Sequence, residues 1–154
     1  MEQTFICKPF ASLSPYELYD ALRLRSEIFV VEQQCVFLEP DDKDQASHHL
    51  LRYRESQLAA YARLVPPGLG FPEMSIGRVV TSQAVRSTGL GKKLMREAIA
   101  QVYVLYGPGP IRIGAQVYAR KFYEVLGFAV AGEVYDEVGI EHVEMVKPFS
   151  GQPG

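Results

Sequence analysis

The order of three segments between residues 74 and 106 constrains the fold more than any other feature of this sequence. Residues 74–81 are apolar enough to predict a strand, and residues 90–106 carry apolar side chains at helical spacing: Leu94, Ala98, Val102 and Leu105. Arg86-Ser87-Thr88-Gly89-Leu90-Gly91 lies between these segments. A strand that turns sharply into a helix leaves the first N–H groups of that helix without partners, and the helix dipole is positive there. The sequence therefore predicts a site for a phosphate or pyrophosphate at this turn.

Three known phosphate-binding patterns can be compared with this turn. A P-loop needs Gly five residues before the Gly-Lys pair and Ser or Thr after it, but Arg86 and Lys93 occupy those positions. The dinucleotide fingerprint needs a third Gly where this chain has Leu94. The remaining pattern, R-x-x-G-x-G from Arg86 to Gly91, resembles the pyrophosphate loop of the GNAT N-acetyltransferases. Taken alone, the hexapeptide also fits an ordinary strand-to-helix turn in which glycines allow tight packing.

The composition is that of one ordinary globular domain. Of the 154 residues, 47% are hydrophobic and 22% are charged, which is enough apolar material for one core. We expect a single domain over residues 1–149 and a disordered tail over residues 150–154. A net charge of −2 gives no reason to expect nucleic acid or a membrane surface as a partner. Two cysteines without CxxC spacing, and a start that lacks a signal-peptide pattern, favour a reduced, cytoplasmic setting.

The remaining patterns predict a mixed α/β protein of the α+β type, with helices packed on a seven-stranded sheet. The predicted strands span residues 5–8, 49–54, 58–65, 74–81, 111–115, 128–134 and 140–146, the last two joined as a hairpin across residues 136–139. The predicted helices span residues 14 to about 30, 90–106 and 117–126. Ser14, Pro15 and Glu17 form a capping-box pattern at the start of the first helix.

A second block of the chain strengthens the resemblance to the GNAT family. After Gln116, Ala119, Phe122-Tyr123 and Gly127-Phe128 match the family's A-x-x-F-Y-x-x-x-G-F pattern, in the correct order after the glycine-rich turn. The first half resembles a narrower group, the ElaA-type GNAT proteins. This likeness rests on residues 24–25, 29–33, the acidic stretch 39–44 and the positions of Cys35 and His49. It extends over residues 76–79, 114–116 and 133–142, so the resemblance covers nearly the whole chain.

The resemblance implies the GNAT acyl-CoA N-acyltransferase fold, in which a mostly antiparallel sheet splays open between its fourth and fifth strands. It also implies acetyl-CoA as co-substrate, with its pantetheine arm in that opening. The pyrophosphate would bind N–H groups of the turn that Arg86 shapes: Ser87, Thr88, Gly89, Leu90, Gly91 and Lys92. A backbone N–H near Val79 or Val80 would stabilise the oxyanion formed from the thioester carbonyl. The acceptor amine attacks directly, so no covalent enzyme intermediate is required.

The resemblance also suggests catalytic residues. Tyr123 lies where the family places the general acid that protonates the leaving CoA thiolate, and a phenol and a thiol are close enough in pKa for this transfer. The alternative is that its ring, like Phe122, only packs beside the cofactor. Gln116 occupies a position where many relatives carry Asn, so it could bind the pantetheine or orient Tyr123.

A base is expected because the acceptor amine arrives as an ammonium ion. The candidates are His49, Glu32, Glu73, Glu141 and His142. A histidine titrates near neutral pH, and His142 follows the final turn on a strand, so it is the favoured base. Each of these side chains could instead be structural or solvent-exposed.

The acceptor side of the site is expected near Arg25, Glu32, His49 and Arg78. For Arg25 and Arg78 a structural ion pair is the favoured interpretation, with Glu32, another internal acid or the substrate as the partner of Arg25.

The acidic stretch 39–44 and the adjacent pair His48-His49 suggest metal ligands at first sight. The stretch lacks the Gly and Glu that an EF-hand requires, and adjacent histidines do not have zinc spacing. We therefore expect no metal and a solvated acidic loop, which could attract a cationic acceptor by its charge.

Together these observations predict an acetyl-CoA-dependent N-acetyltransferase acting on a primary amine of a small molecule or peptide. The alternative is a GNAT-fold module that binds CoA for regulation but has lost turnover. Whether two copies form a homodimer stays open.

Overall fold

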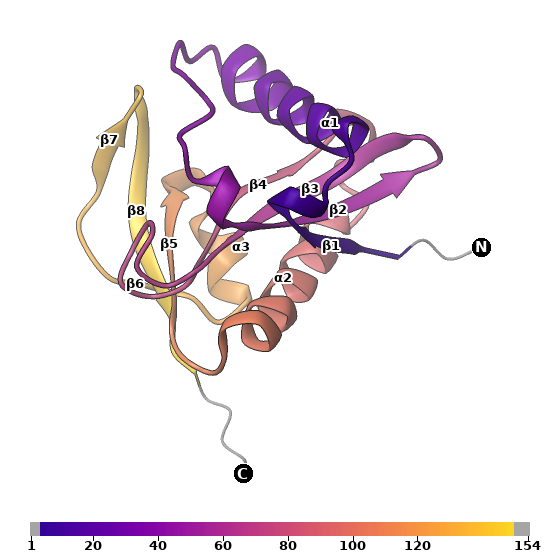
Figure 1. Ribbon diagram of the computed structural model, residues 1–154. Coiled ribbons are helices and arrows are strands. Elements are labelled where there is room, and N and C mark those ends of the chain that lie inside the picture. The colour runs from indigo at the N-terminus through magenta and orange to yellow at the C-terminus, as the bar shows by residue number, and fades with distance from the viewer. Residues whose placement is uncertain (1–3, 150–154) are drawn as a thin grey trace.

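The computed structural model describes residues 4–149, so the tail expected over residues 150–154 lies outside the described part. Eight strands occur in these residues and form two sheets (Figure 1). The first sheet has the antiparallel order β1-β2-β3-β4: Ile6–Pro9, His48–Arg54, Gln57–Val65 and Ser75–Thr81. In the second sheet, β8 (Ile140–Lys147) pairs with three antiparallel partners: β5 (Ile111–Gln116), β6 (Ala129–Val130) and β7 (Tyr135–Glu137).

The helices begin and end largely where the sequence predicts. Helix α1 (Pro15–Arg25) starts with the expected capping box, because the Ser14 hydroxyl accepts from the Glu17 N–H at 3.0 Å and the Glu17 carboxylate accepts from the Ser14 N–H at 2.9 Å. It continues as a π-helix over Ser26–Glu32. Helix α2 (Leu90–Tyr106) ends at Gly107, whose φ of 89° suits glycine. Helix α3 (Arg120–Val125) follows a 3-10 turn over Val117–Ala119.

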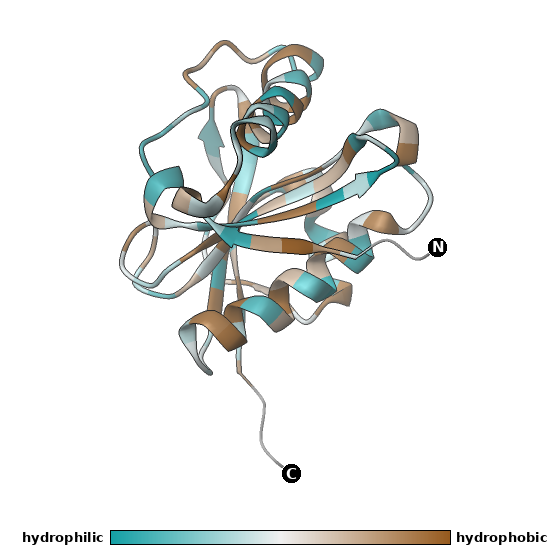
Figure 2. Cartoon of the chain, turned by 45° about the vertical axis from the view of Figure 1, so that its right-hand side comes forward, coloured by the Kyte–Doolittle hydropathy of each residue, from teal (hydrophilic) through white to brown (hydrophobic). Residues whose placement is uncertain are grey.

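Helices cover both faces of the first sheet because its central strands are buried on both faces. Helix α1 packs on one face against Leu51, Tyr61 and Val80. Helix α2 packs on the other face with Leu94 and Val102 against Leu50, Ala60, Ala62 and Leu64. Hydrophobic residues accordingly concentrate in the central strands in Figure 2 and alternate with hydrophilic ones along α2. Neighbouring residues of β3 thus belong to different cores, as expected from side chains that alternate along a strand.

The two sheets meet only where β4 and β5 begin. A single parallel bridge joins Met74 to Ile111, and the Arg112 N–H donates to the Met74 carbonyl at 3.0 Å. Beyond this bridge β4 and β5 share no pairing and belong to different sheets. The expected splay between the fourth and fifth strands is therefore present, and it creates an opening toward the C-terminal ends of both strands.

Two details differ from the sequence-based expectation. Instead of one seven-stranded sheet, the described residues form two sheets of four strands each, because β4 and β5 diverge after one bridge. The predicted strand 128–134 is reduced to β6, and the hairpin to β8 is made by β7. Its turn is formed by Val138 and Gly139, which both have positive φ, a pairing typical of two-residue hairpin turns.

No helix in the described part of the chain combines the length and the apolar character needed to cross a membrane.

Candidate active site

The glycine-rich turn presents its backbone amides to solvent. Within residues 4–149, none of the N–H groups of residues 87–92 makes a well-formed backbone hydrogen bond, and no side chain caps α2. The first helical bond in this region runs from the Lys93 N–H to the Gly89 carbonyl at 3.3 Å. Ser87 and Gly89 have φ values of 66° and 84°, and a side chain added at Gly89 would meet no atom within 4 Å. The turn is therefore an open cradle of amides at the positive end of a 17-residue helix.

The start of α2 also borders the opening between the two sheets. An added Cβ at Gly91 would lie 3.8 Å from the Phe122 ring and 4.0 Å from a methyl carbon of Thr81. Thr81 ends β4, whereas Phe122 belongs to α3, which follows β5. The amide cradle therefore lies next to the end of β4 and to α3, the helix that follows β5.

Strand β4 is interrupted by a bulge inside this opening. Tyr61 pairs with Val80 and Arg63 with Gly77, so Ala62 of β3 faces both Arg78 and Val79. Arg78 has a φ of 50°, in the left-handed region. A bulge leaves one residue out of the ladder and redirects the strand. Because Val80 keeps its partner, Val79 is the better placed of the two valines expected to supply an N–H.

Tyr123 is held by aromatic neighbours and keeps its hydroxyl unengaged. Its ring packs edge-on against Phe122 and Phe128, at centroid distances of 5.1 and 5.9 Å. No described residue hydrogen bonds to its hydroxyl. Burial raises the pKa of Tyr123 to about 12, so the phenol keeps its proton through the neutral range. This pKa lies further from that of a thiol than the ordinary phenol value considered above.

Gln116 ends β5 and bonds to a residue on the opposite arm of the opening. Its amide N–H donates to Gln33 Oε1 at 3.2 Å, and the Gln33 amide donates back to Gln116 Oε1 at 3.1 Å. Gln33 follows the π-helix that extends α1. Gln116 therefore does not bond to Tyr123, which corrects one of the two roles expected for it.

His142 lies directly opposite Gln116 in the β5–β8 register and is buried. Its Nδ1 is 2.8 Å from the Ile140 carbonyl oxygen. A carbonyl can only accept, so Nδ1 carries a proton, and in the neutral ring the lone pair is on Nε2. The ring stacks on Tyr135 at a centroid distance of 5.7 Å. In the described residues nothing occupies Nε2, so it is free to accept a proton.

Three other candidate bases are engaged elsewhere. Hydrogen bonds from Arg86 hold the pKa of Glu32 at about 2, and a hydrogen bond from Arg112 lowers the pKa of Glu73, so both carboxylates are weak bases. His49 is buried, with Nδ1 2.6 Å from the Tyr61 hydroxyl and Nε2 2.9 Å from the Asp44 carbonyl. Burial lowers its pKa.

Glu141 is exposed on β8, beside His142.

The acceptor-binding role expected for Arg25 and His49 does not fit their surroundings, because both are almost completely buried. Arg25 does form an ion pair, but with Glu39 and Asp44 rather than with Glu32. Arg78 also binds Glu39. Glu32 instead makes a bidentate ion pair with Arg86, with N–O distances of 2.6 and 2.7 Å. Arg86 is therefore fixed to the end of the π-helix, which is consistent with a role in shaping the turn.

The segment 39–44 is not the solvated loop that its composition suggests. Glu39 and Asp44 are 3% and 6% exposed. Arginines from α1, β3 and β4 bind the carboxylates of this segment, which brings together charges that lie far apart in the sequence. No group of three or more metal-ligating side chains occurs in the part of the chain that the structure describes.

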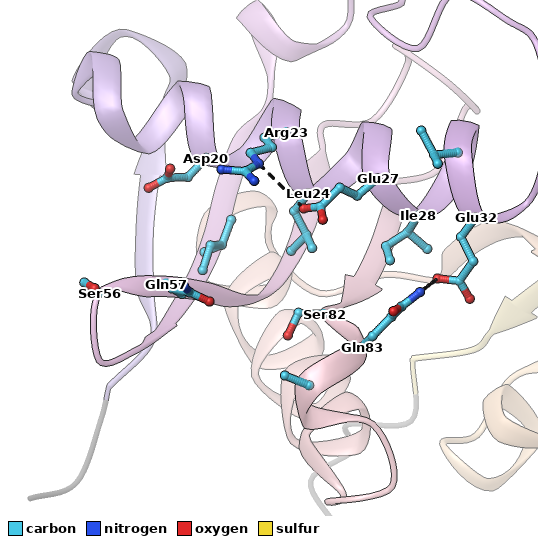
Figure 3. Close-up of a pocket in the computed structure, with 13 residues that line it drawn as sticks. Asp20, Arg23, Leu24, Glu27, Ile28, Glu32, Ser56, Gln57, Ser82 and Gln83 are labelled. Atoms are coloured by element: carbon cyan, nitrogen blue, oxygen red, sulfur yellow. Dashed lines mark hydrogen bonds and ion pairs between the residues drawn. The ribbon is translucent and has the colours of Figure 1, made fainter.

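A groove of about 530 Å³ lies beside α1 and its π-helical extension, on the side that faces the first sheet (Figure 3). Its other wall consists of the β2–β3 turn and residues 82–84, which follow β4. Three of its lining residues are acidic, Asp20, Glu27 and Glu32, and Figure 3 shows Glu32 reaching toward Gln83. Arg23 also lines the groove, 3.9 Å from Glu27, and Glu32 pairs with Arg86, so part of this negative charge is balanced.

Gln33, Glu39 and Cys35 were missed as site residues. Gln33 bonds to Gln116, and the Cys35 thiol lies 3.4 Å from the Val138 carbonyl in the β7–β8 turn. No local sequence pattern indicates these roles. Gln34, between Gln33 and Cys35, has a φ of 55°, which is typical of a tight turn, but this value is known only from the structure.

An open amide cradle at a helix start, next to two strands that splay apart after one bridge, defines an acyl-CoA N-acyltransferase fold. A family model described as an acetyltransferase (GNAT) domain matches residues 29–149. The chain belongs to the GNAT acetyltransferase family.

Relatives of similar length support this assignment. Protein ElaA of Escherichia coli is 34% identical over 139 residues, with 89% of this chain and 91% of the relative covered. Its crystal structure superposes with a TM-score of 0.89 at 32% identity, covering 95% of this chain and 99% of the other. An acyl-CoA N-acyltransferase from Pseudomonas aeruginosa gives a TM-score of 0.90 at 40% identity, again covering 95% and 99%.

Proposed function

We propose that this protein is an acetyl-CoA-dependent N-acetyltransferase that acts in the cytoplasm on a primary amine of a small molecule or peptide. The observation that carries the proposal is the open amide cradle of residues 87–92 beside the opening between β4 and β5. Free amides at a helix start match a pyrophosphate, and a gap between strands admits an extended pantetheine arm. Gly89 leaves room for such a ligand, because an added Cβ there would have no atom within 4 Å.

The residues around the opening supply the remaining groups that direct acyl transfer requires. Acetyl-CoA supplies the thioester. The Val79 N–H, at the β4 bulge, would stabilise the negative charge that develops on the carbonyl oxygen when the amine nitrogen bonds to the carbonyl carbon. Tyr123 would donate its proton to the CoA sulfur as the C–S bond breaks, and the second proton that the amine nitrogen loses on forming the amide would restore the phenol, directly or through water. His142 Nε2 would accept the proton that the acceptor ammonium loses.

The groove along α1 is lined by three carboxylates and one arginine, Arg23, and this excess of acidic groups supports a cationic acceptor. Asp20 and Glu27 line it on the α1 side, and Glu32 closes it next to the phosphate-binding turn. An acceptor that carries a second positive charge would be attracted to this surface.

The test is a measurement of CoA release and of acetyl-CoA affinity with the purified protein and a panel of mono- and polyamines and lysine-containing peptides. We expect acetyl-CoA-dependent release of CoA with at least one cationic amine. Tight acetyl-CoA binding without turnover on any amine would favour the regulatory CoA-binding module, and failure to bind acetyl-CoA would refute both functions.

A further inference from the structure

Six charged side chains, four of them buried and two partly exposed, form a cluster where α1, β3 and β4 meet. The cluster, here called the arginine–carboxylate cluster, contains three residues of each sign: Arg25, Arg63, Arg78, Glu39, Asp41 and Asp44. All three carboxylates come from the segment 39–44, and the three arginines come from three different elements. The cluster therefore attaches this segment to the first sheet at several points.

The attachment points surround the β4 bulge. On β3, the residues on either side of Ala62 both reach into the cluster: the Tyr61 hydroxyl lies 3.4 Å from Arg25 Nη1, and Arg63 binds Asp41 and Asp44 at 2.7 and 2.9 Å. Tyr61 and Arg63 are two residues apart, so their side chains point to the same face of the strand. On β4, the bulge residue Arg78 reaches the same cluster.

Glu39 holds the bulge residue at two points. Arg78 Nε donates to the Glu39 carboxylate, and Arg78 Nη2 donates to the Glu39 carbonyl at 2.8 Å. Its contact with Asp41 is longer, at 3.4 Å. Glu39 is fixed in turn by Arg25, with N–O distances between 2.7 and 3.0 Å. A non-glycine residue with a φ of 50° is uncommon, and it persists where its surroundings hold it in place.

We propose that Glu39 is a positioning residue for acyl transfer: it holds Arg78, and through Arg78 the β4 bulge, so that the Val79 N–H faces the thioester carbonyl. This inference rests on the proposed function. The pyrophosphate cradle lies on a different segment, so loss of the Glu39 contact should affect the reaction and leave the binding of CoA intact. Removal of one oxyanion donor lowers kcat by about 10²- to 10³-fold, and a displaced donor should cost about 10- to 100-fold.

The experiment compares three variants by thermal melting, CoA affinity, kcat and the backbone amide resonance of Val79 in the free protein. Arg78→Gln removes the guanidinium that bonds to both the carboxylate and the carbonyl of Glu39, whereas Glu39→Gln removes only the negative charge and keeps the carbonyl bond. Arg78 is partly exposed, so its substitution disturbs the buried part of the cluster least. Asp44→Asn is the matched control, because it removes the same charge from the same cluster but contacts Arg25 and Arg63 and not Arg78.

We expect all three variants to melt at lower temperature and to bind CoA within about threefold of the wild type. Arg78→Gln should lower kcat by about 10- to 100-fold and shift the Val79 resonance, Glu39→Gln should change both in the same direction by the same or a smaller amount, and Asp44→Asn should do neither. An Arg78→Gln variant with the kcat of Asp44→Asn would overturn the inference and leave the proposed function standing. A wild-type protein without turnover would refute the proposed function, and the inference with it.

Discussion

At the scale of the residue, the two side chains proposed to move protons share one property: each is fixed by its neighbours and keeps one polar atom unengaged. Aromatic packing on two sides orients Tyr123, and its hydroxyl has no partner in the described residues. The Ile140 carbonyl orients His142 through Nδ1 and leaves Nε2 available. Side chains that serve only to stabilise a fold normally have their buried polar atoms paired, as His49 does.

Tyr123→Phe should lower kcat by about 100-fold and change the affinity for acetyl-CoA by less than about threefold, since the ring packing remains and only the transferable proton is lost. Steady-state kinetics and a binding titration measure the two effects. Tyr103→Phe is the control, because Tyr103 is also a partly buried tyrosine but packs on Phe149 away from the opening. Wild-type turnover in Tyr123→Phe would exclude this residue as the acid.

His142→Ala should remove or displace the acidic limb of the pH–rate profile, because the base that accepts the ammonium proton is lost. The measurement is kcat/KM for the acceptor across the neutral and acidic range. His48→Ala serves as the control, since His48 lies at the start of β2 near Tyr106 and not at the opening. An unchanged profile in His142→Ala would assign the base to another group, with Glu141 as the neighbouring candidate.

At the scale of the element, the turn between β4 and α2 combines three local features that do not depend on distant residues. Its amides are free because they belong to the first turn of a helix, and its tight path is permitted by Gly89 in the left-handed region. The length of α2 adds a favourable dipole at the same point. One distant residue contributes: Glu32 pairs with Arg86 and so fixes the entry to the turn from the π-helix.

Gly89→Glu should abolish measurable acetyl-CoA binding, because it places bulk and negative charge where a pyrophosphate has to approach the amides. Isothermal titration with acetyl-CoA tests this. Gly107→Glu is a close control, since Gly107 lies at the other end of the same helix with a φ of 89° and also has no atom within 4 Å of an added Cβ. A dissociation constant that stays the same in Gly89→Glu would refute the assignment of the phosphate site.

At the scale of the whole molecule, the two sheets are joined by one backbone bridge and by side chains that cross the opening. Gln33 and Gln116 bond across it, and Cys35 contacts the β7–β8 turn. The segment that follows Cys35 carries the carboxylates of the arginine–carboxylate cluster. One stretch of chain thus contacts both arms, and the charges that hold it are buried, where loss of one partner costs about 3–5 kcal/mol.

These charges predict how stability depends on pH. Burial alone would raise the pKa of Asp44, but hydrogen bonds and charge from Arg25 and Arg63 outweigh it and hold that pKa below its ordinary value. A carboxyl with a lowered pKa in the folded state stabilises the fold above its unfolded pKa, near 3.9, and this contribution is lost as the pH falls further. His49, whose pKa burial lowers, adds a loss that starts below about pH 6.5, where the unfolded chain binds a proton first.

Melting temperature should therefore decline from neutral pH downward, with the steepest loss below about pH 4. The Asp44→Asn variant should melt at lower temperature at neutral pH and show a smaller decline in acid, because the group that titrates has been removed. Asp42→Asn is the control, since Asp42 is exposed. Parallel pH dependences of wild type and Asp44→Asn would contradict this account.

Local patterns sufficed wherever the physical cause is local. The capping box of Ser14 and Glu17 and the end of α2 at Gly107 were predicted from neighbouring residues and are present. The splay between the fourth and fifth strands is also present, but it was expected from the resemblance to the GNAT family. The predicted strand 128–134 is longer than the observed β6, because apolar residues alone do not show which of them will pair with β8.

What the sequence by itself determined is the glycine-rich turn, since free amides, the left-handed Gly89 and a helix dipole follow from neighbouring residues. Only the tertiary structure decided which acids Arg25 and Arg78 bind, that Glu39 and Asp44 are buried, and that Gln33 meets Gln116. Gln33 and Gln116 are 83 residues apart, and a charge in a sequence does not reveal whether folding will surround it with water or with opposite charge. The difference is physical: backbone geometry is set within a few residues, whereas desolvation and ion pairing are set by whatever the fold brings close.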